Sequence, residues 1–436
     1  MNKGIRIIGF LNFFACVLLG IWFTGCSQTS SISPVQKNSF IKYFGGGKDQ
    51  QAGKVLQSAD GGYVVVGSTN SYTIDGNYDQ FVVKTDAYGN QLWSKTFGGK
   101  GNDFARDIKI NPDGTGYVFV GDKTFAYPSV VSTNWSSLFN IRKISLNGDS
   151  LGSYYFGDTT LIAAPHGLNS GVSMALTNSN IYFSGYTNVL YAQTGITNVY
   201  IGKSDYSGNL VSNSVYGLSG GYSTVTGLFV DNTNRIFNSI NIPTPDNANG
   251  VSIFSISESN FQGFNDIPVP ALVAQNFGLG GIINQNVQTI NDFKLVNSGG
   301  TGNVAFTGAF NGSLYVMLIN QGLTLVTTSW TNIETGLSAS YSEGKAIFST
   351  SDGGFVVTGY FVNTANSNNG QDVFLIKLDA SGKVSWSKSF GGTGNDEGVD
   401  VIQTTDGGYL ISANIAFGTN NNVIGLIKVK SDGTLD

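Results

Sequence analysis

Cysteine and histidine are almost absent from this chain of 436 residues. The two cysteines, Cys16 and Cys26, both lie near the N-terminus, so the rest of the chain can form no disulfide and has no thiol chemistry. The sole histidine, His166, cannot supply a metal cluster, and no nearby serine or cysteine suggests a catalytic triad. We therefore expect a structural or incidental role for His166, and neither a metal nor another cofactor.

Charged residues are also scarce, at 12% of the chain, with a formal net charge of −5. Binding to nucleic-acid phosphates would need clustered lysine and arginine, so nucleic acid is excluded as a partner. Glycine, in contrast, is abundant, with 59 residues. A helical protein would not tolerate that glycine content, whereas short strands joined by glycine and asparagine turns would.

The N-terminus has the pattern of a secretory signal peptide. Lys3 and Arg6 precede an apolar run over residues 7–23, which ends in small residues and a cysteine. A transmembrane anchor is the alternative, but the run is shorter than the roughly 20 residues of a spanning helix and contains Asn12. We therefore expect residues 1–25 to be removed on export.

The end of this segment, Phe23-Thr24-Gly25-Cys26, resembles the lipobox of bacterial lipoproteins. The resemblance implies cleavage before Cys26 and lipidation of Cys26 with diacylglycerol and an N-acyl chain such as palmitate. Ser27, where an aspartate often signals retention in the inner membrane, favours the outer membrane. Residues 26–38 are rich in Ser, Thr, Gln and Asn, which is typical of a flexible tether.

The remaining chain is built from repeats of about 60 residues. A turn glycine is followed by an aromatic residue eight positions later, in the pairs Gly89 and Phe97, Gly148 and Phe156, Gly208 and Tyr216, Gly322 and Trp330, and Gly382 and Phe390. A lysine lies five positions before such a glycine at Lys84, Lys143, Lys203, Lys377 and Lys428. The spacing of the aromatic residues gives seven units once Phe44 is counted.

The last unit lacks its final strand, and that strand is found at the other end of the chain. Gly433 has no aromatic partner, whereas FIKYFGG at Phe40–Gly46 matches WSKTFGG at Trp93–Gly99 and WSKSFGG at Trp386–Gly392. Completing the last blade with the first strand would close a ring and remove an open edge. We predict an all-β, seven-bladed β-propeller of four-stranded antiparallel blades over residues 39–436, with the N-terminal strand closing the last blade.

These units resemble the SBBP-type β-propeller repeats of secreted bacterial proteins and lipoproteins. The resemblance is plain over residues 43–99 and 345–430 and fades between about 220 and 320. It implies a propeller fold and export, and it brings no defined catalytic residues.

Three sets of recurring polar residues have structural explanations. Asp60, Asp352 and Asp406 precede Gly-Gly pairs and can cap tight turns, whereas a calcium loop would need further ligands. For the repeated lysines, pairing with turn carboxylates or with backbone carbonyls between blades is favoured over an anion site. Asp49, Asp103 and Asp396 follow the end of a blade, where we expect them to link blades. Contact with a ligand or metal at the mouth of the tunnel is the alternative.

The connections from strand two to strand three, and those between blades, vary in length, whereas the others are short and constant. Because the two variable classes emerge on one face of a propeller, that face is the candidate binding face. The candidate ligand-binding residues are aromatic side chains in or beside these loops: Trp135, Tyr72, Tyr127 and Tyr191, together with Tyr360. Packing of each ring on its own blade is the alternative.

Two functions follow from this pattern. The first is a monomeric, lipid-anchored module of the cell envelope that binds a protein or glycan as a scaffold; assistance to outer-membrane barrel assembly would be a special case. The alternative is a carbohydrate-active enzyme, a glycosidase or lyase, with carboxylates converging at the mouth of the tunnel. The candidate carboxylates that depart from the repeat are Glu258, Glu334, Glu343, Glu397, Asp158 and Asp246.

Overall fold

The computed structural model describes most of the chain after residue 36, which consists of β-strands joined by turns and connections. The described residues are 37–73, 75–126, 135–157, 168–188, 197–217, 224–231, 234–243, 249–256, 263–268, 287–296, 303–310, 312–319, 339–363, 370–418 and 421–436. They contain no helix that could span a membrane. Residues Asn38–Asp436 form one compact unit, and the predicted signal peptide, the lipobox and Cys26 lie outside the described residues.

The strands form seven sheets, which we number in chain order. Sheet 1 holds β2 (Gln50–Gln57), β3 (Tyr63–Thr69), β4 (Asp79–Thr85) and β5 (Gln91–Phe97). Sheet 2 holds β6 (Phe104–Ile110), β7 (Gly116–Ala126), β8 (Trp135–Ser145) and β9 (Ser150–Phe156). Sheet 3 holds β10 (Asn169–Leu176), β11 (Asn180–Thr187), β12 (Asn198–Asp205) and β13 (Leu210–Gly217), with β17 (Gly263–Pro268) beside β13.

The remaining sheets complete the series. Sheet 4 holds β14 (Thr224–Val230), β15 (Ile236–Pro243) and β16 (Asn249–Ile256), and sheet 5 holds β18 (Val287–Leu295), β19 (Val304–Phe310) and β20 (Ser313–Ile319). Sheet 6 holds β21 (Ala339–Ser349), β22 (Phe355–Asn363), β23 (Gln371–Leu378) and β24 (Val384–Phe390). Sheet 7 holds β25 (Glu397–Gln403), β26 (Tyr409–Ala416) and β27 (Asn422–Val429), and β1 (Phe40–Phe44) is its fourth strand.

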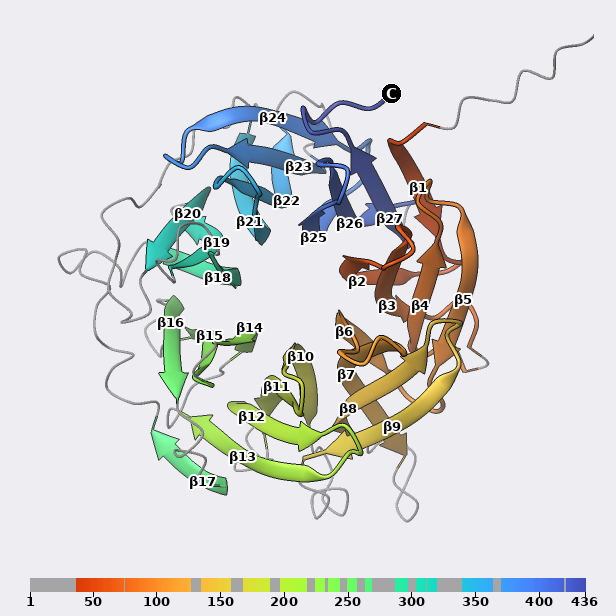
Figure 1. Ribbon diagram of the computed structural model, residues 1–436, viewed down its shortest axis with the longest axis vertical. Coiled ribbons are helices and arrows are strands. Elements are labelled where there is room, and N and C mark those ends of the chain that lie inside the picture. Colours follow the sequence, from red (N-terminus) through yellow and green to blue (C-terminus); the bar gives the residue numbers. More distant parts are fainter. Residues whose placement is uncertain are drawn as a thin grey trace, which may run out of the picture. The chain divides into compact units, whose positions relative to one another are not determined.

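The sheets are arranged in a ring (Figure 1). The first strand of each sheet contacts the first strand of the next, and β25 of sheet 7 contacts β2 of sheet 1. The N-terminal strand β1 pairs antiparallel with β27, with Phe40 opposite Lys428 and Phe44 opposite Ile424. The predicted propeller and the predicted closure of the last blade by the N-terminal strand are thus confirmed.

The predicted set of seven complete, four-stranded blades is not confirmed throughout. Sheets 4 and 5 have three described strands each, although the four-stranded antiparallel blade is present in the other sheets. β17, which follows sheet 4 in the chain, pairs parallel with β13 of sheet 3 instead of extending its own sheet. This departure falls in the segment where the glycine and lysine pattern of the repeat fades, so the number of complete blades stays a prediction.

Hydrophobic side chains from adjacent sheets form the core between the blades. Val65 and Phe81 of sheet 1, for example, pack with Leu410, Ile424 and Leu426 of sheet 7, and all five are almost fully buried. The recurring strand residues are therefore core residues, as their alternation predicts.

The turn aspartates and the repeated lysines pair with each other. Asp60 caps its turn by accepting the Gly62 N–H at 2.9 Å, beside Gly61 at a φ of 83°, where glycine is favoured. Lys84, 3% exposed, contacts the same carboxylate at 2.8 Å and the Thr85 carbonyl at 2.9 Å. The contacts recur between Lys377 and Asp352, and between Lys428 and Asp406. Lys143 instead donates to the Tyr206 carbonyl of sheet 3 at 3.1 Å.

The aspartates that follow a blade link neighbouring sheets. The Asp49 carboxylate accepts the Asn422 N–H of sheet 7 at 2.7 Å and also accepts the Tyr78 hydroxyl. The Asp103 carboxylate accepts the Thr124 N–H of sheet 2 at 2.6 Å, and its backbone N–H donates at 2.6 Å to the Tyr78 carbonyl beside β4 of sheet 1. Asp396 likewise accepts the Ala416 N–H of sheet 7 and donates to the Gln371 carbonyl of sheet 6, both at 2.7 Å. The predicted role in joining blades is confirmed for these residues.

The turn glycines of the repeat lie against aromatic rings of the preceding sheet. A Cβ atom on Gly148 would lie 2.9 Å from the Trp93 ring, and one on Gly433 would lie 2.7 Å from the Trp386 ring. At Gly208 the distance to the Tyr154 ring would be 1.9 Å. Both the close approach and a positive φ require glycine at these turns.

Candidate functional site

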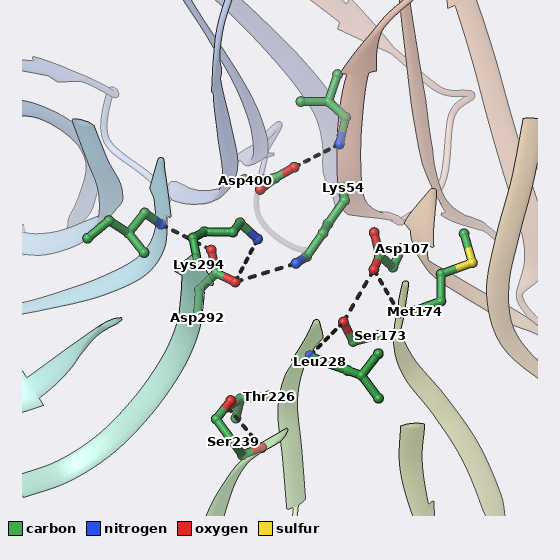
Figure 2. A network of polar contacts seen from close by, with 12 residues as sticks. Lys54, Asp107, Ser173, Met174, Thr226, Leu228, Ser239, Asp292, Lys294 and Asp400 are labelled. Carbon is green, nitrogen blue, oxygen red and sulfur yellow. Dashed lines mark hydrogen bonds and ion pairs between the residues drawn. The ribbon is translucent and has the colours of Figure 1, made fainter. Parts of the chain in front are cut away.

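The centre of the ring is lined by residues that a repeated bulge points inward. In all seven sheets, the pairing of the first strand with the second shifts register at the same place. Such bulges re-aim side chains. Polar residues at or beside the shift therefore meet in the centre: Lys54, Asp107, Ser173, Asp292 and Asp400 (Figure 2).

Four of these sheets make the same hydrogen bond to the next sheet. Asp107 accepts the Met174 N–H at 3.0 Å and Asp292 accepts the Ile347 N–H at 3.1 Å. Ser173 Oγ accepts the Leu228 N–H at 3.1 Å, and Asp400 accepts the Val55 N–H at 3.0 Å. Each bond joins one inner strand to the next, so these residues hold the ring together (Figure 2).

The channel cluster comprises three lysines and three aspartates: Lys54, Lys109, Lys294, Asp107, Asp292 and Asp400. Lys109 pairs with Asp107 at 2.8 Å, whereas Asp292 contacts Lys294 at 3.0 Å and Lys54 at 3.5 Å. Burial disfavours the charged form of Asp107, but the nearby Lys109 and Lys54 ammonium groups outweigh it and lower the pKa of Asp107 to about 2. Burial raises the pKa of Asp400 despite the attraction of Lys54 and Lys294.

A cavity of about 620 Å³ adjoins the channel cluster on the side of the turns between first and second strands. Its walls come from the first strand of every sheet and include Leu56, Phe229, Phe348 and Ile402. The three lysines of the cluster balance its three aspartates in number. Among the described residues, no group of three His, Cys, Asp or Glu side chains is suited to hold a metal. The contacts of the cluster favour a structural role.

A second polar cluster surrounds Glu343 of β21, which is 6% exposed. Its Oε1 accepts Asn291 Nδ2 at 2.7 Å and Thr289 Oγ1 at 3.1 Å. Its Oε2 accepts the hydroxyls of Tyr360 at 2.8 Å and Tyr341 at 3.0 Å. We call these residues, with Lys345 and Glu397, the glutamate cluster.

Glu343 and Glu397 come from neighbouring sheets and share one lysine. Lys345 Nζ lies 3.3 Å from Glu343 Oε1 and 3.2 Å from Glu397 Oε1. Burial opposes ionisation of Glu343, but Lys345 and the hydrogen-bond donors lower its pKa. Two carboxylates from different blades thus converge as the enzyme hypothesis requires. Glu343 nevertheless stays ionised, whereas a general acid needs a raised pKa.

A hollow of about 1290 Å³ lies between sheets 6 and 7. Its walls come from the start of β23, the connection from β24 to β25, and the connection from β26 to β27. Because strands alternate in direction within a blade, these connections share one face, which is the predicted binding face. We call this hollow the rim groove.

Exposed hydrophobic side chains lie in the rim groove. Tyr43 on β1 is 51% exposed, and Phe417, after β26, is 62% exposed. Their ring centroids are 6.1 Å apart, and Ile41 of β1 lines the groove beside them. Five side-chain amides also line it: Gln371, Asn395, Asn414, Asn421 and Asn422. Aromatic faces among amides are a typical recognition surface.

The predicted ligand-binding residues are only partly described. Tyr72 is 54% exposed, and its ring lies 5.8 Å from that of Phe81. Trp135, expected inside a long loop, is instead the first residue of β8 and pairs with Ala126, because β7 and β8 extend further than the repeat predicts. Tyr360, expected in or beside a loop, is half-buried within β22 and bonds Glu343. The following predicted residues lie outside the described residues: Tyr127, Tyr191, His166, Glu258, Glu334, Asp158 and Asp246.

Sequence reasoning missed Tyr43 and Phe417, although each leaves a signal. Tyr43 occupies the position where the matching strands have Thr96 and Ser389, and where sheet 2 has a second aromatic residue, Tyr155. Phe417 is a lone aromatic residue in a loop of glycine and asparagine, at the position of Ser71 in the first unit. Comparing non-core positions between units would have found both.

No protein-family model matches the chain, and no curated protein matches it. A solved polysaccharide lyase of family PL25, an ulvan lyase, is 10% identical, with 89% of this chain and 96% of that chain covered and a TM-score of 0.51. The Pan2 WD40 domain of Neurospora crassa is 12% identical, with 87% and 91% covered and a TM-score of 0.45. A protein of unknown function from Dyadobacter fermentans DSM 18053 is 10% identical, with 90% and 98% covered and a TM-score of 0.45. At these identities the ulvan lyase supports the propeller fold alone.

Proposed function

We propose that this protein is a binding module of the cell envelope that takes a glycan or protein ligand in the rim groove. The observation that carries the proposal is the exposed pair Tyr43 and Phe417 in a hollow of about 1290 Å³. Water-exposed aromatic side chains in a hollow lined by amides favour ligand binding, because a ligand would cover them. The module would act as a monomer of seven complete blades.

The N-terminal pattern supports attachment to a membrane. With lipid on Cys26, residues 27–38 would tether the propeller, whose first strand begins at Phe40. A single propeller held in this way would present its binding face to envelope components. The outer membrane is the proposed location, because Ser27 stands where an aspartate often signals retention in the inner membrane.

Binding of envelope extracts to three forms of the protein tests the proposal: the wild type, a double variant and a control. Tyr43→Thr with Phe417→Ser restores the residues of other repeat units, so the fold should be kept while the aromatic surface is lost. We expect at least a tenfold loss of the captured ligand. The matched control is Leu92→Ser. Leu92 on β5 is 58% exposed, and the equivalent position of the repeat in sheet 6 is a serine, Ser385. Equal capture by all three proteins would contradict the proposal.

A carbohydrate-active enzyme is the second candidate, and the shared Lys345 between Glu343 and Glu397 is the observation that favours it. This candidate ranks second because the contacts of Glu343 keep its carboxylate ionised, whereas a general acid must carry a proton. Incubation with envelope and plant polysaccharides, followed by assay of new reducing ends and of unsaturated sugar products, tests it. Products formed by the wild type and lost in Glu343→Gln would place the enzyme first.

A further inference from the structure

We infer that the rim groove selects uncharged glycans and rejects polyanionic ones. This inference rests on the proposed function, since it names the class of ligand for the same groove. Three features of the groove carry it: the signs of its charges, the chemistry of its polar groups and the bare backbone of one wall.

The first feature is the absence of positive charge from the described lining. Among the described residues that line the groove there is no lysine, arginine or histidine, whereas Asp396 and Glu397 are present. Glu397 is matched by Lys345, and Asp396 accepts the N–H groups of Ala416 and Gly392. Sulfate or carboxylate groups of a ligand would meet carboxylates and carboxamides without a compensating cation, so their desolvation would not be offset.

The second feature is the match between carboxamides and hydroxyl groups. A carboxamide carries donors and an acceptor, and a sugar hydroxyl also donates and accepts, so each pair satisfies both partners. Five such side chains line the groove with Tyr43 and Phe417. Asn395 and Asn414 already accept backbone N–H groups through Oδ1, and Asn421 donates to the Gly47 carbonyl, so the remaining donors and acceptors of the five are those that can meet hydroxyls at the edges of a sugar ring. The apolar C–H face of the ring can lie on an aromatic ring.

The third feature is a wall with few side chains, formed by Gly391, Gly392, Thr393 and Gly394. A Cβ atom on Gly392 would meet nothing within 4 Å, so the space before it is open. A Cβ on Gly394 would lie 2.3 Å from the Ala416 Cβ, so a side chain there would disturb the packing against β26. A flat ring can therefore approach the backbone closely.

The volume of the groove fits several sugar units. At about 1290 Å³ it exceeds the roughly 300–1,000 Å³ of sites for drug-sized ligands. An oligosaccharide segment is therefore favoured over a monosaccharide. A peptide is the alternative occupant, because β1 and β24, which line the groove, are the outer strands of their sheets, and the test below therefore includes a peptide.

Binding of three probe sets to the full chain, measured by calorimetry, tests the inference. The probes are neutral gluco-, manno- and chito-oligosaccharides, oligogalacturonides with sulfated oligosaccharides, and an oligolysine peptide. We expect at least one neutral probe to bind ten times more tightly than every anionic probe. Tyr43→Thr with Phe417→Ser should weaken that binding tenfold or more, and Leu92→Ser should leave it unchanged.

A charge insertion separates selectivity from mere loss of binding. Ser389 is exposed in the groove, so Ser389→Lys should keep the fold and increase the affinity for the anionic probes at least fivefold. Tighter binding of anionic probes to the wild type, or binding of the peptide alone, would overturn the inference. Binding of no probe would also overturn it, whereas the proposed function would fail only if envelope capture were insensitive to Tyr43 and Phe417.

Discussion

The carboxylate of Asp400 accepts a hydrogen bond from the backbone N–H of Val55 at 3.0 Å, although the two residues lie at opposite ends of the propeller sequence. This contact joins the inner strand of sheet 7 to that of sheet 1. Asp107, Ser173 and Asp292 make the same contact elsewhere in the ring. The inner ring is therefore held by side-chain acceptors as well as by hydrophobic packing.

Replacing Asp292 with alanine should destabilise the protein. The change would leave Lys294 and Lys54, with side chains 30% and 18% exposed, without their nearest carboxylate. After allowance for this partial exposure, we expect a loss of about 2–4 kcal/mol in the free energy of unfolding, measured by urea denaturation.

The control for this prediction is Asp149→Ala, which breaks the exposed pair of Lys95 and Asp149 at 3.4 Å. An exposed pair of this kind is worth less than about 1 kcal/mol. Equal losses in the two variants would show that the channel cluster contributes no more than a surface ion pair.

Asp103 should make stability depend on pH. Burial raises its pKa to about 6, and pairing with Lys123 offsets only part of that effect. Because the folded state then binds a proton that the unfolded state has released, this group stabilises the fold most below about pH 4, near its unfolded pKa. Its contribution is lost as the pH rises towards 6.

Asp103→Asn checks this dependence. The amide oxygen can still accept the Thr124 N–H, so the contact of this residue with β7 should remain. We expect the difference in unfolding free energy between wild type and variant to change by about 1–3 kcal/mol between pH 4 and pH 7. A difference that stays constant over this range would contradict the raised pKa.

Alanine at Gly208 should be far more damaging than alanine at Gly76. Both glycines have a positive φ, 87° and 77°, so both substitutions strain the backbone by about 1–2 kcal/mol. Only at Gly208 would the new Cβ meet a ring, that of Tyr154 at 1.9 Å, since nothing lies within 4 Å at Gly76. Because the backbone strain is the same in both variants, the difference between their melting temperatures reports the clash with the Tyr154 ring. Similar melting temperatures would contradict the prediction.

Phe44→Ala should weaken the closure of the last blade. Phe44 is 5% exposed and belongs to the core between sheets 1 and 7, so the cavity left behind should cost about 3–5 kcal/mol in unfolding free energy. Ile41→Ala on the same strand is the control, because Ile41 is 36% exposed and should cost less than about 1 kcal/mol. Equal effects would mean that burial of β1 contributes little to stability.

The features that repeat were the ones that could be predicted from the sequence. Lys84 recurs with Asp60 because both stabilise a turn that every unit needs, and the matching of Phe40–Gly46 to later strands revealed the closing strand. The channel cluster could not be predicted, because it depends on a bulge that sets which residues face the centre. Tyr43 was overlooked since it lies in a strand that the repeat assigns to the scaffold. In sheets 4 and 5 the sequence has drifted, and there the pattern stops predicting strand order.

The pairing of β1 with β27 also sets an order of events during synthesis. The strand from Phe40 to Phe44 is among the first parts of the propeller to be made, and its partners, from Ile424 to Lys428, are among the last. The edge of β1 therefore stays unpaired until nearly the whole chain has been translated. The export proposed above would suit this closure, because a chain that crosses a membrane unfolded brings its two ends together only after it is complete.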